Sequence, residues 1–216
     1  MNREILNNFK KVFIYILIYL CFSAIIIYFN LNRRYLIFNV GLSLIPYIIS
    51  TFCVNHKNKV FLCFIGLVIT TIFYPNAIYM FTDLIHIKTH EYYVFSGGNV
   101  NYIQDYTHWI KLSCDTVMVV LSLVLSFESF VNILKILRCY GYKIASFILL
   151  MLYSGICGIA VYIGRFLRFN SWDILQIRDI TTSILSSATE NDYMLIGIFA
   201  IVHFVIILMF FNLKNN

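Results

Sequence analysis

The chain has 216 residues, of which 61% are apolar and only 12% are charged, and its mean hydropathy is +0.82. This composition excludes a soluble domain of that size and predicts an integral membrane protein. The net charge of +6 does not indicate a nucleic-acid partner, because no polar segment carries a patch rich in Lys and Arg with interleaved aromatic residues. The lipid bilayer is the partner that the composition predicts.

Apolar runs of roughly spanning length predict an all-α fold, a polytopic transmembrane helix bundle that forms one domain over residues 1–216. The expected spans lie near residues 12–29, 35–54, 60–80, 109–134, 144–163 and 193–211. No small-residue cleavage site follows the first run, so we expect it to be retained as a helix. Pro46 lies inside the second run and Pro75 inside the third, and both predict kinks, because neighbouring groups in a membrane can satisfy the freed carbonyls.

A further amphipathic segment near residues 172–188 predicts a helix that lies in the membrane interface. Apolar residues recur there at helical spacing, with charged and hydroxyl residues between them. Asn170 at the N-cap with Asp173 at N3 would open this helix and complement its dipole. Trp172 would be an interfacial aromatic residue.

Two polar segments interrupt the apolar pattern, at residues 74–86 and at residues 164–173. Each follows roughly 20 residues of apolar helix, which is the length that crosses a hydrocarbon core of about 30 Å. Independent counting from the two spans therefore places both segments at one depth and on one face of the membrane. The sequence predicts a polar site there.

The basic residues predict the orientation through the positive-inside bias. Of the 16 Lys and Arg, nine lie on the side of the N-terminus and seven on the other side, or five if Arg165 and Arg168 belong to the site. We therefore expect a cell-membrane protein with both termini in the cytoplasm. The polar segments and the loop at residues 88–107 would lie outside.

Residues 73–86 and 162–173, with Ile45-Pro46-Tyr47 upstream, resemble signature segments of the bacterial membrane proteins catalogued as the domain of unknown function 1361 family. The resemblance begins near Tyr35 and covers nearly all of the remaining chain. It implies a membrane protein without an established activity. In residues 106–115 the expected Trp-Tyr-Asp is spread over Trp109 and Asp115. The residues that the resemblance assigns to the family pattern are Pro75, Asn76, Asp83, His86, Arg165, Arg168, Asn170, Trp172 and Asp173.

Asp83, His86 and His90 are spaced i, i+3 and i+7, which would place them on one face of a continuous helix. A carboxylate and two imidazoles are ligands suited to a divalent metal, the one cofactor that the pattern suggests, although HExxH is absent. A hydrogen-bonded interfacial pair of Asp83 and His86, or acid–base groups, would use the same residues. His203, within the sixth span, is expected to be a hydrogen-bonded residue between helices.

Arg165 and Arg168 are spaced i, i+3 and would share a face where guanidinium groups suit a phosphate or a carboxylate. Snorkelling anchors and salt bridges to acidic residues explain the same pattern. Asp115 is expected about 9 Å below the outer edge of the fourth span, where a buried acid needs a partner. We expect these two arginines to supply it.

Two classes of function follow. The first is a structural, accessory or transporter-like membrane component in which the polar residues join helices, with another membrane protein as a partner. The alternative is a membrane-embedded enzyme acting on a phosphorylated or anionic lipid-like substrate, with a metal-assisted mechanism as one form of it. Its anion-binding candidates are Arg165, Arg168, Asn170, Trp172, Asp173, Asn76 and Asp115. Asp83 and His86 are the catalytic candidates, expected to face a wet pocket, so that their replacement would cost little stability.

Overall fold

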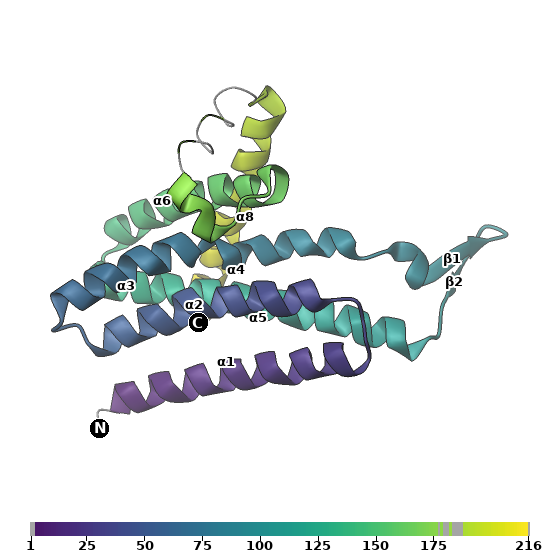
Figure 1. The fold of residues 1–216 in the computed structure, drawn as a ribbon, viewed down its shortest axis with the longest axis horizontal. Helices are drawn as coiled ribbons and strands as arrows, with labels where there is room; N and C mark the ends of the chain where they lie inside the picture. The colour runs from purple at the N-terminus through teal and green to yellow at the C-terminus, as the bar shows by residue number, and fades with distance from the viewer. Residues whose placement is uncertain (1–2, 177, 179–181, 183–187, 216) are drawn as a thin grey trace.

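The computed structural model describes residues 3–176, 178, 182 and 188–215. Within these residues six helical segments are long and apolar enough to cross a membrane, which confirms an all-α bundle of a multi-pass membrane protein (Figure 1). The segments are Ile5–Tyr28, Arg34–Asn55, Val60–His86, Tyr106–Ile136, Lys143–Leu167 and Glu190–Lys214. Each segment extends beyond its expected span at one end or both, because the flanking residues continue the helix.

The described helical elements are, in chain order, α1 (Arg3–Tyr28), α2 (Arg34–Asn55), α3 (Val60–Phe73), α4 (Pro75–Tyr79), the 3₁₀ helices η1 (Met80–His86) and η2 (Thr89–Glu91), α5 (Tyr106–Ile136), α6 (Lys143–Tyr162), the π-helical turn η3 (Ile163–Leu167), the 3₁₀ helix η4 (Ser171–Gln176) and α8 (Glu190–Asn215). Strands β1 (Tyr93–Ser96) and β2 (Asn99–Tyr102) lie between η2 and α5.

Helix α5 is the centre of the bundle. Within its most apolar stretch 72% of the residues are buried, against 11% for the corresponding stretches of α1 and α8. One apolar cluster joins α1 and α2 to the first half of α5, with Leu36 and Met118 fully buried. A second joins α4, α6 and α8 to the second half, around Ile78 and Phe130. The large apolar residues left exposed on the outer helices suit contact with lipid.

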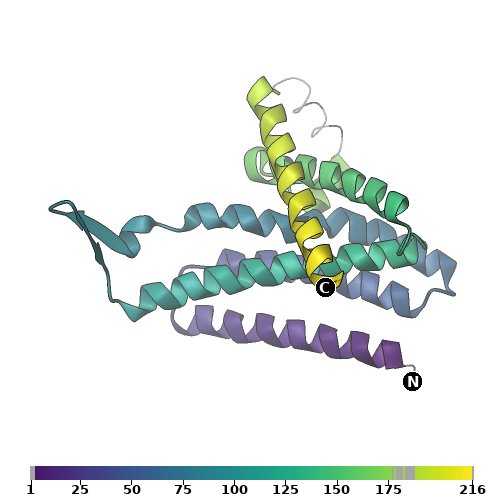
Figure 2. The same cartoon turned by 180° about the vertical axis from the view of Figure 1, so that it is seen from behind.

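Helix α8 crosses the other helices steeply and packs on α6 (Figure 2). Gly158 of α6 permits the close approach, because a Cβ atom there would lie 2.5 Å from the carbonyl oxygen of Ile196. Small residues at helix interfaces are the usual means by which membrane helices pack backbone to backbone.

Strands β1 and β2 form an antiparallel hairpin that projects beyond the helices (Figure 1). Gly97 and Gly98 make its turn with φ of 59° and 81°, as a two-residue turn with both φ values positive requires. The sequence marks this turn by its glycines, but the exposed four-residue strands were not predicted. The turn between α1 and α2 lies at the same end of the bundle, which we call the hairpin end.

The two prolines act differently. Helix α2 continues through Pro46, whereas α3 ends at Phe73 and α4 starts afresh with Pro75 in its first turn. The side chain of Asn76 donates a hydrogen bond to the Phe73 carbonyl at 2.9 Å, which satisfies a group exposed by the break. The chain then tightens into η1, and this places Asp83 toward the bundle.

Candidate functional site

Asp83 and Arg165 form an ion pair that joins the two polar segments, as expected. Asp83 is buried and its Oδ1 atom lies 2.6 Å from Nη2 of Arg165, while Oδ2 accepts a hydrogen bond from Asn39 of α2 at 2.8 Å. Both carboxylate oxygens therefore have partners. The expectation that Asp83 faces a wet pocket is wrong, because η1 turns its side chain into the interface between α2 and η3.

Further contacts hold the Arg165 guanidinium in place. It donates hydrogen bonds to the hydroxyl of Thr82, including one from Nε at 3.1 Å, and it stacks 4.4 Å above the ring centre of Tyr79. Gly164 leaves room for that ring, since a Cβ atom there would lie 3.2 Å from it. The π-helical turn η3 changes the helical phase at the end of α6, and Arg165 lies within this turn.

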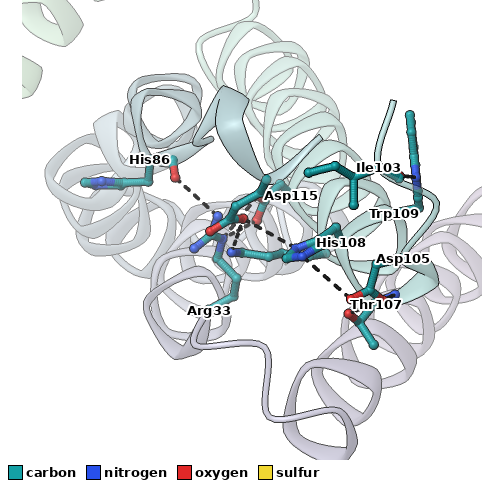
Figure 3. Close-up of polar contacts among 10 residues, drawn as sticks. Arg33, His86, Ile103, Asp105, Thr107, His108, Trp109 and Asp115 are labelled. Atoms are coloured by element: carbon teal, nitrogen blue, oxygen red, sulfur yellow. Dashed lines mark hydrogen bonds and ion pairs between the residues drawn. The ribbon is translucent and has the colours of Figure 1, made fainter. Parts of the chain in front are cut away.

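Asp115 pairs with Arg33 and not with Arg165 or Arg168. Nε of Arg33 lies 2.8 Å from Oδ1 and 3.1 Å from Oδ2 of Asp115 (Figure 3). The two side chains are 7% and 5% exposed. Arg33 lies just before α2, in the turn between the first two spans. The packing of α2 on α5 therefore brings it to Asp115. One signal for this pair was present in the sequence, namely a buried acid that needs a cation at the same end.

His86 lies between the two ion pairs. Its backbone carbonyl accepts a hydrogen bond from Nη2 of Arg33 at 3.3 Å (Figure 3). Its exposed ring places Nε2 3.5 Å from Nη1 of Arg165. The ring edge also packs on Tyr35. We call Arg33, Asp83, Asp115 and Arg165 the ion-pair cluster. Its two arginines balance its two aspartates.

The expected metal face of Asp83, His86 and His90 does not form. The chain becomes extended at Ile87, with ψ of 116°, and His90 lies exposed on the separate turn η2. The extended residue ends the helical phase that the i, i+3, i+7 spacing assumed. Among the residues that the structure describes, no group of three or more His, Cys, Asp or Glu side chains could hold a metal ion.

The residues that follow Arg165 do not lie on the same helical face as Arg165. Arg168 adopts a left-handed conformation with φ of 61° and is exposed, so the two arginines do not share the face that their i, i+3 spacing predicted. Asp173 accepts hydrogen bonds from the backbone N–H of Asn170 at 2.7 Å and from its side chain at 3.2 Å, as an N-terminal capping acid does. Trp172 is 47% exposed and its ring edge meets Phe38.

The interfacial helix expected near residues 172–188 is described only in part. Its first turn belongs to the 3₁₀ helix Ser171–Gln176. Residues 177, 179–181 and 183–187 lie outside the described residues.

A cavity of about 200 Å³ lies beside the Asp83–Arg165 pair, between α2, the α3–α4 break and the end of α6. Asn76 lines it and donates a hydrogen bond to the Ser171 hydroxyl at 2.7 Å, which ties the two polar segments together a second time. Asn39 and Tyr79 line the same cavity and also touch the ion pair. The cavity and the cluster are therefore neighbours.

A more exposed cluster lies where the hairpin meets α5. Glu91 pairs with Lys111, and this hydrogen bond lowers the pKa of the Glu91 carboxyl below its usual value. Asp105 caps α5 by accepting hydrogen bonds from the backbone N–H of Thr107 at 2.9 Å and from its hydroxyl, and these bonds lower its pKa. His108 lies between the two acids, 3.9 Å from Glu91 and 3.7 Å from Asp105.

His203 is hydrogen-bonded between helices, as expected. It is fully buried, and its Nε2 and Nδ1 atoms lie 2.8 Å from the hydroxyls of Tyr74 and Ser154 respectively. These contacts join α8 to the α3–α4 break and to α6. We call these three residues the His203 site.

No curated protein and no solved structure matches the chain. The model of one family, described as "Protein of unknown function (DUF1361)", matches residues 38–208, which is well over half of the chain. The match contains both polar segments, Asp115 and His203, while α1 and Arg33 precede it. The chain therefore belongs to the DUF1361 family of proteins of unknown function.

Proposed function

We propose that the protein is a non-catalytic accessory component of the cell membrane, in which the ion-pair cluster locks the helices at the hairpin end. The observation that carries the proposal is that all four charges of the cluster have partners within it. A site that binds an anionic substrate needs a cation free to receive it. Here the guanidinium of Arg165 and both oxygens of Asp83 are already engaged.

The lock connects four separate stretches of the chain. Arg33 precedes α2, Asp83 belongs to η1, Asp115 to α5 and Arg165 to η3. Buried charges near the membrane interior cost several kcal/mol when unpaired, so an arrangement that pairs all four favours one relative placement of these elements. A rigid hairpin end suits a component that presents β1 and β2 to another membrane protein.

The orientation that we propose places both termini in the cytoplasm and the hairpin outside. It is supported by the basic residues in the turns between α2 and α3 and between α5 and α6, which lie at the end opposite the hairpin (Figure 1). Asn99→Cys in a background without the native cysteines tests it. An impermeant thiol reagent should label intact cells, and labelling only after lysis would reverse the orientation.

The lock is tested with Arg165→Met and the matched variant Arg168→Met. Each variant removes one guanidinium group, and the two positions lie three residues apart. Only Arg165→Met removes the ion-pair partner of the buried Asp83. Arg165→Met should therefore lower the abundance of folded protein in membranes, whereas Arg168→Met should remain near the parental level. The double exchange Asp83→Arg with Arg165→Asp should restore part of the loss. Equal abundance of the two single variants would contradict the lock.

A membrane enzyme acting on a phosphorylated or anionic lipid-like substrate is the second candidate. The observation that favours it is the exposed His86 ring beside Arg165, a position suited to proton transfer. His86→Ala should accumulate normally, because water already reaches the ring. If this variant also complements a deletion strain, the hypothesis of a membrane enzyme that uses His86 is contradicted. If the variant accumulates but does not complement, the enzyme hypothesis is favoured over that of an accessory component.

A further inference from the structure

The cavity beside the ion pair is lined by both polar and apolar residues. Asn39, Asn76 and Ser171 supply amide and hydroxyl groups, while Leu42 and Ile72 supply hydrocarbon. Two lining residues are exposed at its edge, the apolar Phe38 and the polar Asn170. An apolar and a polar residue side by side on the rim are typical of a site at the boundary between bilayer and water. It suits an amphipathic molecule that enters from the bilayer.

The hydrogen bonds already formed around the cavity define what its polar residues still offer. Asn76 donates from its side-chain nitrogen to Phe73 and to Ser171, and Asn39 donates to Asp83. The side-chain oxygens of Asn39 and Asn76 accept no hydrogen bond from the part of the chain that is described. Since an amide oxygen is an acceptor only, these two groups call for a ligand that donates.

The described lining of the cavity carries no charge. Neither an acid nor a base is among the described residues that line it, and Arg165, which stacks on the lining residue Tyr79, pairs with Asp83. An anionic headgroup would have to compete with that buried carboxylate for Arg165. An uncharged headgroup would leave the pair intact, so the uncharged lining and the existing ion pair favour it.

We propose that this cavity binds the headgroup of an uncharged membrane lipid that donates hydrogen bonds through a hydroxyl or an amide. The donor groups of the lipid face Asn39 and Asn76, the Ser171 hydroxyl provides one further donor, and the hydrocarbon follows Phe38 and Leu42. A volume of about 200 Å³ is smaller than the roughly 300–1,000 Å³ of sites that enclose a whole small molecule. The headgroup is therefore enclosed while the chains remain in the bilayer.

Three lipids that share their acyl chains test the proposal on the purified full-length protein in detergent, with binding measured by native mass spectrometry. They are dioleoylglycerol, its 3-acetyl ester and dioleoyl phosphatidic acid. The first is neutral with a hydroxyl donor, the second is neutral without a donor, and the third is anionic. Dioleoylglycerol should bind one to one and about tenfold or more tightly than the acetyl ester, since unmet buried acceptors weaken binding.

Two variants test whether the lipid binds in this cavity. Ala160→Phe fills the cavity, and the control Ile159→Phe adds the same ring at the neighbouring, exposed position on α6. Binding of dioleoylglycerol should fall about tenfold in the first variant and stay unchanged in the second. Equal binding of the ester, tighter binding of phosphatidic acid, or unchanged binding by Ala160→Phe would each overturn the proposal. The three-lipid comparison uses the parental protein, so it decides the matter even if Ala160→Phe does not accumulate. It is also independent of the locking role.

Discussion

The ion-pair cluster and the His203 site both join helices that are far apart in the sequence, but the first uses formal charges and the second uses none. The cluster lies at the hairpin end, and the side chain of its Arg165 is 20% exposed. His203 has no exposed surface and contacts only hydroxyls through its ring nitrogens. The difference indicates that charges are kept near the bundle end, while neutral hydrogen bonds serve where water does not reach.

The largest effect is expected from Arg33→Met, which removes one partner of the more deeply buried ion pair. Asp115 is 3% exposed, and breaking a buried pair from one side costs about 3–5 kcal/mol. We expect most of the folded protein to be lost. The measurement is the amount of monodisperse protein recovered from membranes, together with its thermal unfolding midpoint in detergent.

Arg34→Met is the matched control, because Arg34 is the next residue in the chain and is exposed. It should change the midpoint little, since a surface charge contributes about 0–1 kcal/mol. If Arg33→Met unfolds at the same temperature as this control, Asp115 has another partner. That result would contradict the comparison drawn between the ion-pair cluster and the His203 site.

A smaller effect is expected from His203→Leu, which removes the ring nitrogens that the buried hydroxyls of Tyr74 and Ser154 contact. The expected loss is about 1–3 kcal/mol in the free energy of unfolding, measured in detergent by denaturant titration. Combining His203→Leu with Tyr74→Phe and Ser154→Ala should recover much of the loss, because a fully apolar site leaves no polar group unmet. A triple variant less stable than His203→Leu alone would show that the site does more than satisfy hydrogen bonds.

The smallest effect is expected from Glu91→Gln, in the half-buried pair with Lys111 where the hairpin meets α5. Lys111 lowers the pKa of Glu91 in the folded protein, so this pair stabilises the fold above the unfolded pKa of the carboxyl. That contribution is lost as the pH falls through the lowered, folded value. At pH 7 the variant should be less stable by about 1 kcal/mol or less.

The measurement is the thermal unfolding midpoint of parental protein and Glu91→Gln, compared from pH 7 down to the most acidic pH at which both remain soluble. The difference between them should shrink below about pH 4.5, near the ordinary pKa of the carboxyl. A difference that grows as the pH falls would contradict the sign of this pKa shift.

Several features of the site were accessible from sequence because they depend on neighbouring residues. The depth of residues 74–86 and 164–173 follows from helical rise, and this correctly brought Asp83 to Arg165. The capping contact of Asp173 with Asn170 is also local. The prediction that Asp83, His86 and His90 share one helical face was wrong. It assumed a continuous helix, but the extended residue Ile87 ends the helix before His90.

The sequence by itself determined that this protein crosses the membrane and which segments do so, because the transfer of apolar helices from water to lipid depends on composition over about 20 residues. Only the tertiary structure decided that Arg33 pairs with Asp115, 82 residues away, and that His203 contacts Tyr74 across 129 residues. Several charges lay at similar depth, so depth alone could not choose among them. The packing of α2 and α8 in the bundle determines which residues become partners. This packing depends on contacts between helix surfaces that form only when the chain folds.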